Sequence, residues 1–133
     1  MSTKLRGKVS TFGGPKDKGV GASEGLALVD SNNLHLVKDY FLPEQPPGTT
    51  GLARRLNPKT YYIACRWDYK VTSRASLLNR LVEVTNPRTK KSAKAKPVDW
   101  GPNEKTNRVA DISPGLADYL GVQTDDVVEV TLD

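Results

Sequence analysis

The chain has 133 residues, of which 37% are hydrophobic and 26% charged, and its formal net charge is +5. This composition excludes a wholly disordered chain, and no apolar run is long enough for a membrane-spanning helix. We therefore expect one folded domain over residues 1–133, with a modest core. The 11 glycines and 9 prolines favour short elements joined by turns.

The first part of the chain alternates strand-like runs with turns. Residues 5–12 show the period-two pattern of a strand, which a Gly-Gly-Pro turn at residues 13–15 ends. Residues 16–25 predict a wide glycine-rich loop, which lacks the Gly-Lys-Ser/Thr ending of a phosphate-binding loop. The apolar run at residues 26–29 predicts a short buried strand, and residues 43–51 predict an exposed loop that could form a binding rim.

The clearest strand lies at residues 60–67, where Tyr61, Ile63, Cys65 and Trp67 are predicted to share one face. A helical turn is expected near residues 77–81, followed by a hairpin with strands at 82–86 and 91–98. The hairpin carries several basic residues, namely Arg88, Lys90, Lys91, Lys94 and Lys96. We interpret them more readily as a solvated face than as a groove for a polyanion.

The last part of the chain predicts a short helix before a closing strand. Ser113 suits an N-cap, the helix runs over residues 114–120, and Gly121 ends it. Residues 127–132 predict the final strand. The many short strands together favour a small β-barrel.

Asp99 is the most conspicuous candidate for chemistry. It follows a short apolar approach and precedes Trp100 and a Gly-Pro turn at residues 101–102. A carboxyl group beside an aromatic ring suits the handling of a sugar, and an apolar setting would raise its pKa, as an acid catalyst requires. From this segment alone, a polar residue capping a turn is the simpler interpretation.

The chain has a single cysteine, Cys65, and a single histidine, His35. One cysteine excludes an internal disulfide, and these two residues are too few for a zinc site of several His or Cys ligands. We expect no metal or cofactor. His35 lies in an apolar neighbourhood, so a packed or surface histidine is a simpler interpretation than a catalytic one.

Several motifs, taken in order, resemble the rare lipoprotein A-like double-psi β-barrels, a superfamily that includes expansins, barwin-like proteins and, more distantly, lytic transglycosylases with a related barrel. The resemblance is clearest over residues 60–132. It is carried by Val82-Glu83-Val84-Thr85-Asn86, a basic turn, Val98-Asp99-Trp100-Gly101-Pro102, Arg108-Val109-Ala110-Asp111-Ile112-Ser113, Leu116-Ala117 and Leu120-Gly121.

The resemblance implies a mainly β fold, a six-stranded double-psi barrel with one or two short helices and long loops. Its groove would bind a polysaccharide, typically peptidoglycan, with Asp99 as catalytic acid and Asp111 as a second carboxylate in the same groove. Arg108 would hold one of these carboxylates or a sugar acid. The residues expected to bind substrate are Trp100, Arg108, Tyr62, Trp67 and Cys65.

One departure from the family bears on catalysis. Cleaving members often carry Ala-His where this chain reads Ala64-Cys65, and a cysteine with an ordinary pKa is no general base for sugar chemistry. Hydrolysis usually needs a second carboxylate, whereas a lytic transglycosylase can manage with one because a hydroxyl of the sugar attacks. The sequence leaves cleavage and binding open.

Three functions therefore stand as hypotheses. The first is a peptidoglycan-cleaving barrel, and the second is a barrel that only binds a polysaccharide or a protein partner, for example as a protease inhibitor. The third, ranked below both, is a nucleic-acid-binding barrel that uses the basic hairpin. The N-terminus lacks the apolar core of a signal peptide, so the sequence leaves the localisation unknown, and a wall-acting protein would need delivery by a phage or another route.

Overall fold

The computed structural model describes residues 3–132, so that residues 1, 2 and 133 of the predicted domain lie outside the described residues. The strands are β1 (Thr3–Thr11), β2 (Tyr62–Cys65), β3 (Val82–Thr85), β4 (Ser92–Trp100), β5 (Arg108–Ile112) and β6 (Val127–Leu132). The α-helices are α1 (Leu52–Arg55), α2 (Arg74–Leu78) and α3 (Pro114–Leu120), and the 3-10 turns are η1 (Leu34–Leu36), η2 (Lys38–Tyr40) and η3 (Glu104–Thr106).

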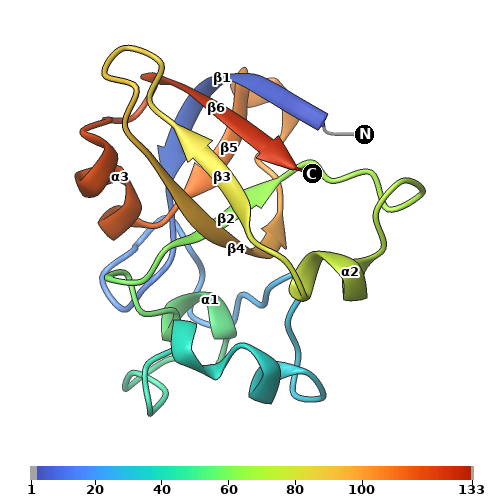
Figure 1. Cartoon of the computed structure of the whole chain (residues 1–133). Coiled ribbons are helices and arrows are strands. Elements are labelled where there is room, and N and C mark those ends of the chain that lie inside the picture. The colour runs from blue at the N-terminus through green and yellow to red at the C-terminus, as the bar shows by residue number, and fades with distance from the viewer. Residues whose placement is uncertain (1–2, 133) are drawn as a thin grey trace.

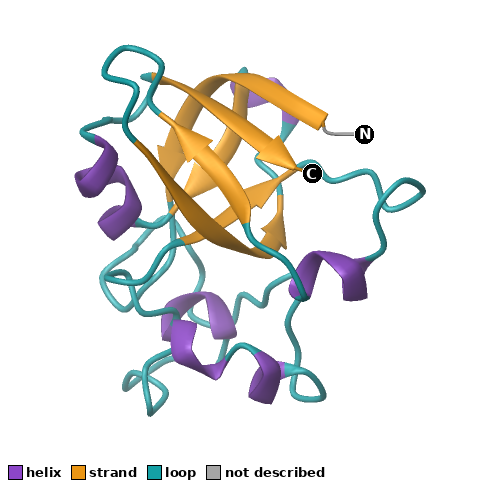
Figure 2. Ribbon diagram, in the orientation of Figure 1, coloured by secondary structure: helices purple, strands orange, loops and turns teal. Residues whose placement is uncertain are grey.

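The strands close into a barrel in the order β1-β5-β2-β4-β3-β6, with β6 pairing back onto β1 (Figure 1). Within residues 3–132, the pairs β1–β5 and β2–β4 are parallel and the other four pairs are antiparallel. The predicted fold class, a mainly β six-stranded barrel with short helices and long loops, is confirmed. Three short α-helices occur in these residues, against the one or two expected. Figure 2 shows them outside the strands.

The barrel interior is filled by alternate residues of the strands, as the period-two pattern predicts. On β3, Val82 and Val84 are fully buried while Glu83 between them is exposed. The short strand β2 differs because all four of its residues are buried. Its second face is covered by the long segment between β1 and β2, which lies beneath one end of the barrel in Figure 1. The strand predicted at residues 60–67 is observed over Tyr62–Cys65, and both of its faces are buried.

The helix α3 follows its prediction at both ends. The hydroxyl oxygen of Ser113 accepts a hydrogen bond of 3.2 Å from the Leu116 N–H, and Gly121 ends the helix with a φ of 71°. Leu116 and Leu120 are buried. No helix in residues 3–132 has the length and apolar character needed to cross a bilayer.

The predicted buried strand at residues 26–29 is wrong. These residues have no strand conformation, although Leu28 and Val29 are buried. The Leu28 N–H donates a single 3.2 Å hydrogen bond to the Val98 carbonyl oxygen of β4. An apolar run indicates burial, but only repeated pairing makes a strand, so periodicity could not separate the two cases.

Candidate functional site

An extra residue in β4 sets the position of Asp99. Along the parallel pair of β2 and β4, Ile63 lies opposite Pro97, and the next residue, Ala64, lies opposite Asp99, so that Val98 has no partner. Such a bulge re-aims the side chains that follow it and is common beside binding sites. It places Asp99 directly beside Ala64 on the neighbouring strand.

A second irregularity sets the position of Asp111 on β5. Here Val109 is the residue without a partner on β1. The bulge needs the glycine at position 7, because a Cβ atom on Gly7 would lie 2.5 Å from Val109 Cγ1. Two residues further on, Asp111 lies opposite Ser10 of β1 and opposite Ala64 of β2. Each candidate acid thus follows a bulge closely.

These pairings place Ser10, Asp111, Ala64 and Asp99 in one row across four adjacent strands. Laterally paired residues point to the same face of a sheet, and neighbouring strands lie about 4.8 Å apart. The backbones at Asp111 and Asp99 are therefore about 10 Å apart. Ala64 lies between them in the row and is buried.

Both carboxyl groups line a groove of about 490 Å³, which we call the acidic groove. Ser10, Asp99 and Asp111 of the row line it, and its other walls come from the end of β1, the glycine-rich loop, the turn after β4 and the start of β5. The charged residues that line it are Asp17, Glu24, Asp99, Asp111 and Arg108. Carboxyl groups outnumber cationic groups there, although the chain as a whole carries a net charge of +5.

Asp99 is held in a fixed orientation. Its Oδ1 accepts hydrogen bonds from the backbone N–H groups of Ala27, at 2.8 Å, and Trp100, at 2.9 Å. Burial raises the pKa of Asp99, the two hydrogen bonds oppose this rise, and the charge of Glu24 adds to it. The net effect is a raised pKa.

Asp111 is in a different environment. None of the residues 3–132 donates a hydrogen bond to its carboxyl group. Burial raises the pKa of Asp111 to about 6, with Arg108 opposing the rise and the charges of Asp99 and Asp17 adding to it. A group that titrates just below neutral pH is suited to proton transfer. The sequence placed Asp99 first as the acid, whereas the local environment favours Asp111.

Arg108 and Trp100, which the resemblance implies as substrate-binding residues, also line the groove. Arg108 pairs with Asp125, through Nε to Oδ1 at 2.9 Å and Nη2 to Oδ2 at 3.4 Å. It therefore acts on Asp111 only through its charge. Trp100 is 45% exposed, and its Nε1 donates a 3.0 Å hydrogen bond to the Trp67 carbonyl oxygen. This bond fixes the ring and leaves apolar surface for a ligand.

The other three predicted substrate-binding residues lie outside the acidic groove. Tyr62 and Cys65 are fully buried, and burial raises the pKa of the Cys65 thiol. Because side chains alternate along β2, Cys65 points away from the face that Ala64 shares with the two acids. Trp67 is 7% exposed, and its Nε1 donates to the Asp99 carbonyl oxygen at 2.8 Å. Direct ligand contact by these three residues is not supported.

His35 is exposed on η1 and does not line the groove. The sequence interpretation missed the contribution of the glycine-rich loop, which supplies Asp17 and Glu24. Asp17 shapes this loop by accepting hydrogen bonds from the N–H groups of Gly13, at 2.7 Å, and Gly19, at 2.9 Å. The Asp-x-Gly spacing signals a local turn, but no local pattern indicates that the loop covers β4.

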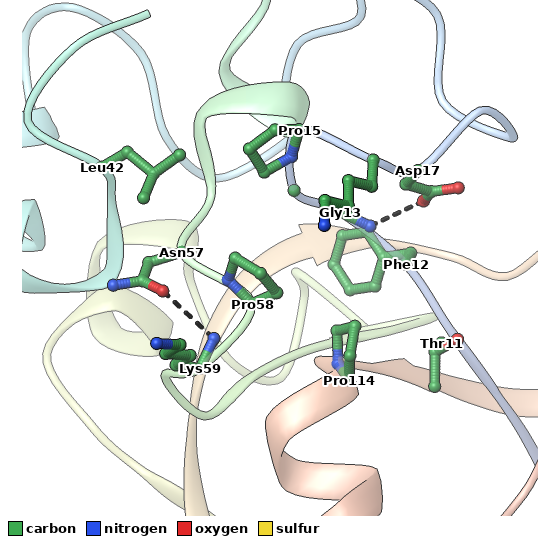
Figure 3. Close-up of a pocket in the computed structure, with 12 residues that line it drawn as sticks. Thr11, Phe12, Gly13, Pro15, Asp17, Leu42, Asn57, Pro58, Lys59 and Pro114 are labelled. Carbon is green, nitrogen blue, oxygen red and sulfur yellow. Dashed lines mark hydrogen bonds between the residues drawn. The ribbon is translucent and has the colours of Figure 1, made fainter. Parts of the chain in front are cut away.

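A second hollow, of about 540 Å³, adjoins the groove and shares Thr11, Phe12 and Asp17 with it. We call it the proline pocket because Pro15, Pro58 and Pro114 line it (Figure 3). No part of the sequence interpretation indicated this pocket. Its residues come from four separate parts of the chain that only the fold brings together.

No protein-family model matches the chain, and no curated protein matches its sequence significantly. Among residues 3–132, no group of three or more His, Cys, Asp or Glu side chains has an arrangement that could hold a metal ion. The candidate function therefore rests on the geometry of the groove and on the motif resemblance.

Proposed function

We propose that the protein acts on a cell-wall polysaccharide, peptidoglycan above all, and that the acidic groove binds and cleaves the glycan. The observation that carries this proposal is the row in which Asp99 and Asp111 face one groove on either side of Ala64. The exposed ring of Trp100 at the same groove offers a flat apolar surface for a sugar ring. The motif resemblance to rare lipoprotein A-like barrels points to the same class of ligand.

Asp111 is the proposed proton donor. With a pKa of about 6, about a tenth of the Asp111 side chains carry a proton at pH 7 and about half at pH 6. The proton passes to the glycosidic oxygen as the bond between that oxygen and the anomeric carbon breaks. Asp111 has no hydrogen-bond donor among the described residues to compete for its carboxyl group, so it is free to turn toward the substrate.

Asp99 is proposed to act as the ionised partner. The two backbone N–H groups on its Oδ1 favour the carboxylate form, and the residue lines the groove. A carboxylate in this position stabilises the positive charge that develops on the sugar ring. In a lytic reaction, a hydroxyl of the same sugar attacks the anomeric carbon and its proton is lost to the ionised Asp111, which regenerates the acid.

A barrel that binds the glycan without cleaving it is the second candidate. The observation in its favour is that the groove carboxylates Asp17, Glu24 and Asp99 all accept backbone hydrogen bonds, as structural carboxylates do. A binding role would need Trp100 and the groove shape but no proton donor.

Clearing of purified cell walls tests the proposal. We expect wild type to lower the turbidity and to release anhydro-sugar ends, whereas Asp111→Asn and Asp99→Asn bind walls without clearing them. Asp118→Asn is the matched control, because Asp118 is exposed on α3 and does not line the groove. Wall binding without clearing by wild type would favour the second candidate. No binding and no clearing would refute both.

A further inference from the structure

The proline pocket lies directly beside the acidic groove. The two hollows share Thr11, Phe12 and Asp17, so a ligand that fills the groove can extend into the pocket without leaving the surface. A volume of about 540 Å³ falls in the range of sites for small ligands. The pocket plays no part in the chemistry proposed for Asp99 and Asp111, because neither residue lines it.

The pocket is built on rigid backbone. Gly13 and Gly14 have φ values of 88° and 99°, and a Cβ atom on Gly13 would lie 2.5 Å from the Tyr62 hydroxyl oxygen. The loop at Pro58 is tied to the start of α3, since the Gly115 N–H donates a 2.7 Å hydrogen bond to the Pro58 carbonyl oxygen. Because these walls are fixed, a ligand would bind with little ordering of the protein.

The interior of the pocket is largely apolar. Figure 3 shows Phe12, Pro58 and Pro114 around one space, with Asn57 and Lys59 beside it. The Asn57 Oδ1 accepts a 3.1 Å hydrogen bond from the Lys59 N–H, which leaves the Asn57 amide nitrogen as a donor. Such a lining suits short aliphatic groups next to a peptide carbonyl.

The charge at this pocket is opposite to that of the groove. Lys16 and Lys59 line the pocket and are exposed, and neither ammonium group is paired within the described residues. The carboxylate of Asp17 is already occupied by the N–H groups of Gly13 and Gly19. A ligand with an anionic part is therefore attracted to this end of the surface.

We infer that the proline pocket is a second subsite, which binds a short acidic peptide carried by the glycan in the acidic groove. This inference rests on the proposed function and adds that the substrate is a peptide-bearing glycan. Small apolar side chains of the peptide pack against Phe12 and the prolines, and its carboxylates lie near Lys16 and Lys59. A purely anionic sugar would leave the apolar walls unused.

The test compares glycan strands that carry their peptides with strands from which an amidase has removed them. Wild type should bind the peptide-bearing strands about 2- to 30-fold more tightly than the bare strands, which is the range expected for two surface ion pairs. The double variant Lys16→Gln/Lys59→Gln should lose this ion-pair contribution and show a smaller preference for the peptide-bearing strands. The control Lys70→Gln/Lys94→Gln removes the same charge from exposed sites outside the pocket and should keep the preference.

Equal binding of both strands by wild type would overturn the inference while leaving the proposed function intact. A preference that survives undiminished in the Lys16/Lys59 double variant would also overturn the inference. A second measurement separates the two proposals further, by titrating the protein with the dipeptide alanyl-glutamate and following backbone amide NMR signals. Shifts of the amide signals of Gly13, Gly14, Lys16, Asp17, Asn57 and Lys59, with no binding of either strand, would support a peptide subsite and refute the glycan function. If the amide signals do not shift and neither strand binds, both the peptide subsite and the proposed function are overturned.

Discussion

Replacing Asp111 with Asn should stabilise the protein at neutral pH. The folded protein holds the pKa of Asp111 at about 6, whereas an aspartate in an unfolded chain has a pKa of about 3.9. A raised pKa means that the folded state binds the proton more tightly than the unfolded state. Its contribution to stability is therefore fully present below about pH 4 and is lost as the pH rises through about 6.

The size of the effect follows from this difference. Two pKa units correspond to about 2.7 kcal/mol, and because Asp111 keeps some contact with solvent we expect about 1–2 kcal/mol. Asn removes the ionisation, and it breaks no hydrogen bond, because the Asp111 carboxyl group makes none within residues 3–132. For a chain of this length the gain corresponds to a rise in Tm of about 3–8 °C at pH 7.5.

Thermal unfolding of wild type and Asp111→Asn between pH 4 and pH 8 measures this difference. The two proteins should have similar Tm values at pH 4, diverge as the pH rises from about 4 to about 6, and keep a constant difference above that range. The control Asp118→Asn should follow wild type throughout. An Asp111→Asn protein that is no more stable than wild type at pH 7.5, or whose advantage is greatest at pH 4, would refute the reasoning. A gain in stability with a loss of wall clearing would mark Asp111 as a residue kept for function.

Three further outcomes are expected. Asp99→Ala leaves two backbone N–H groups without their acceptor and should lower the free energy of urea unfolding by about 1–3 kcal/mol. Asp99→Asn keeps an acceptor oxygen and should cost less. Equal losses of stability in the two variants would argue against a stabilising role for these two hydrogen bonds. Gly7→Ala brings a Cβ atom to 2.5 Å from Val109 Cγ1 and should cost about 1–3 kcal/mol, whereas Gly25→Ala, which meets nothing within 4 Å, should be nearly neutral. Cys65 should resist alkylation at pH 8 until the protein unfolds, because the thiol is buried and its pKa is raised; rapid labelling of the folded protein would contradict its burial.

The sequence predicted the elements whose signals are local. The alternation in β3 and β6 reflects a sheet with one face inward, so it could be recognised without knowing the partner strands. The ends of α3 are set by Ser113 and Gly121, because capping depends on residues within one turn. Asp99, Asp111, Trp100 and Arg108 were also selected from the sequence, and all four line one groove.

Tertiary structure alone decided how those residues meet. The bulges at Val98 and Val109 place both acids beside Ala64, and the register that creates them depends on pairing between strands far apart in the chain. Burial and neighbouring charges, rather than sequence context, separate the environments of Asp99 and Asp111. The proline pocket likewise joins four parts of the chain that are separate in sequence. Local propensity acts over a few residues, whereas register, burial and electric fields arise only once the chain has closed into a barrel.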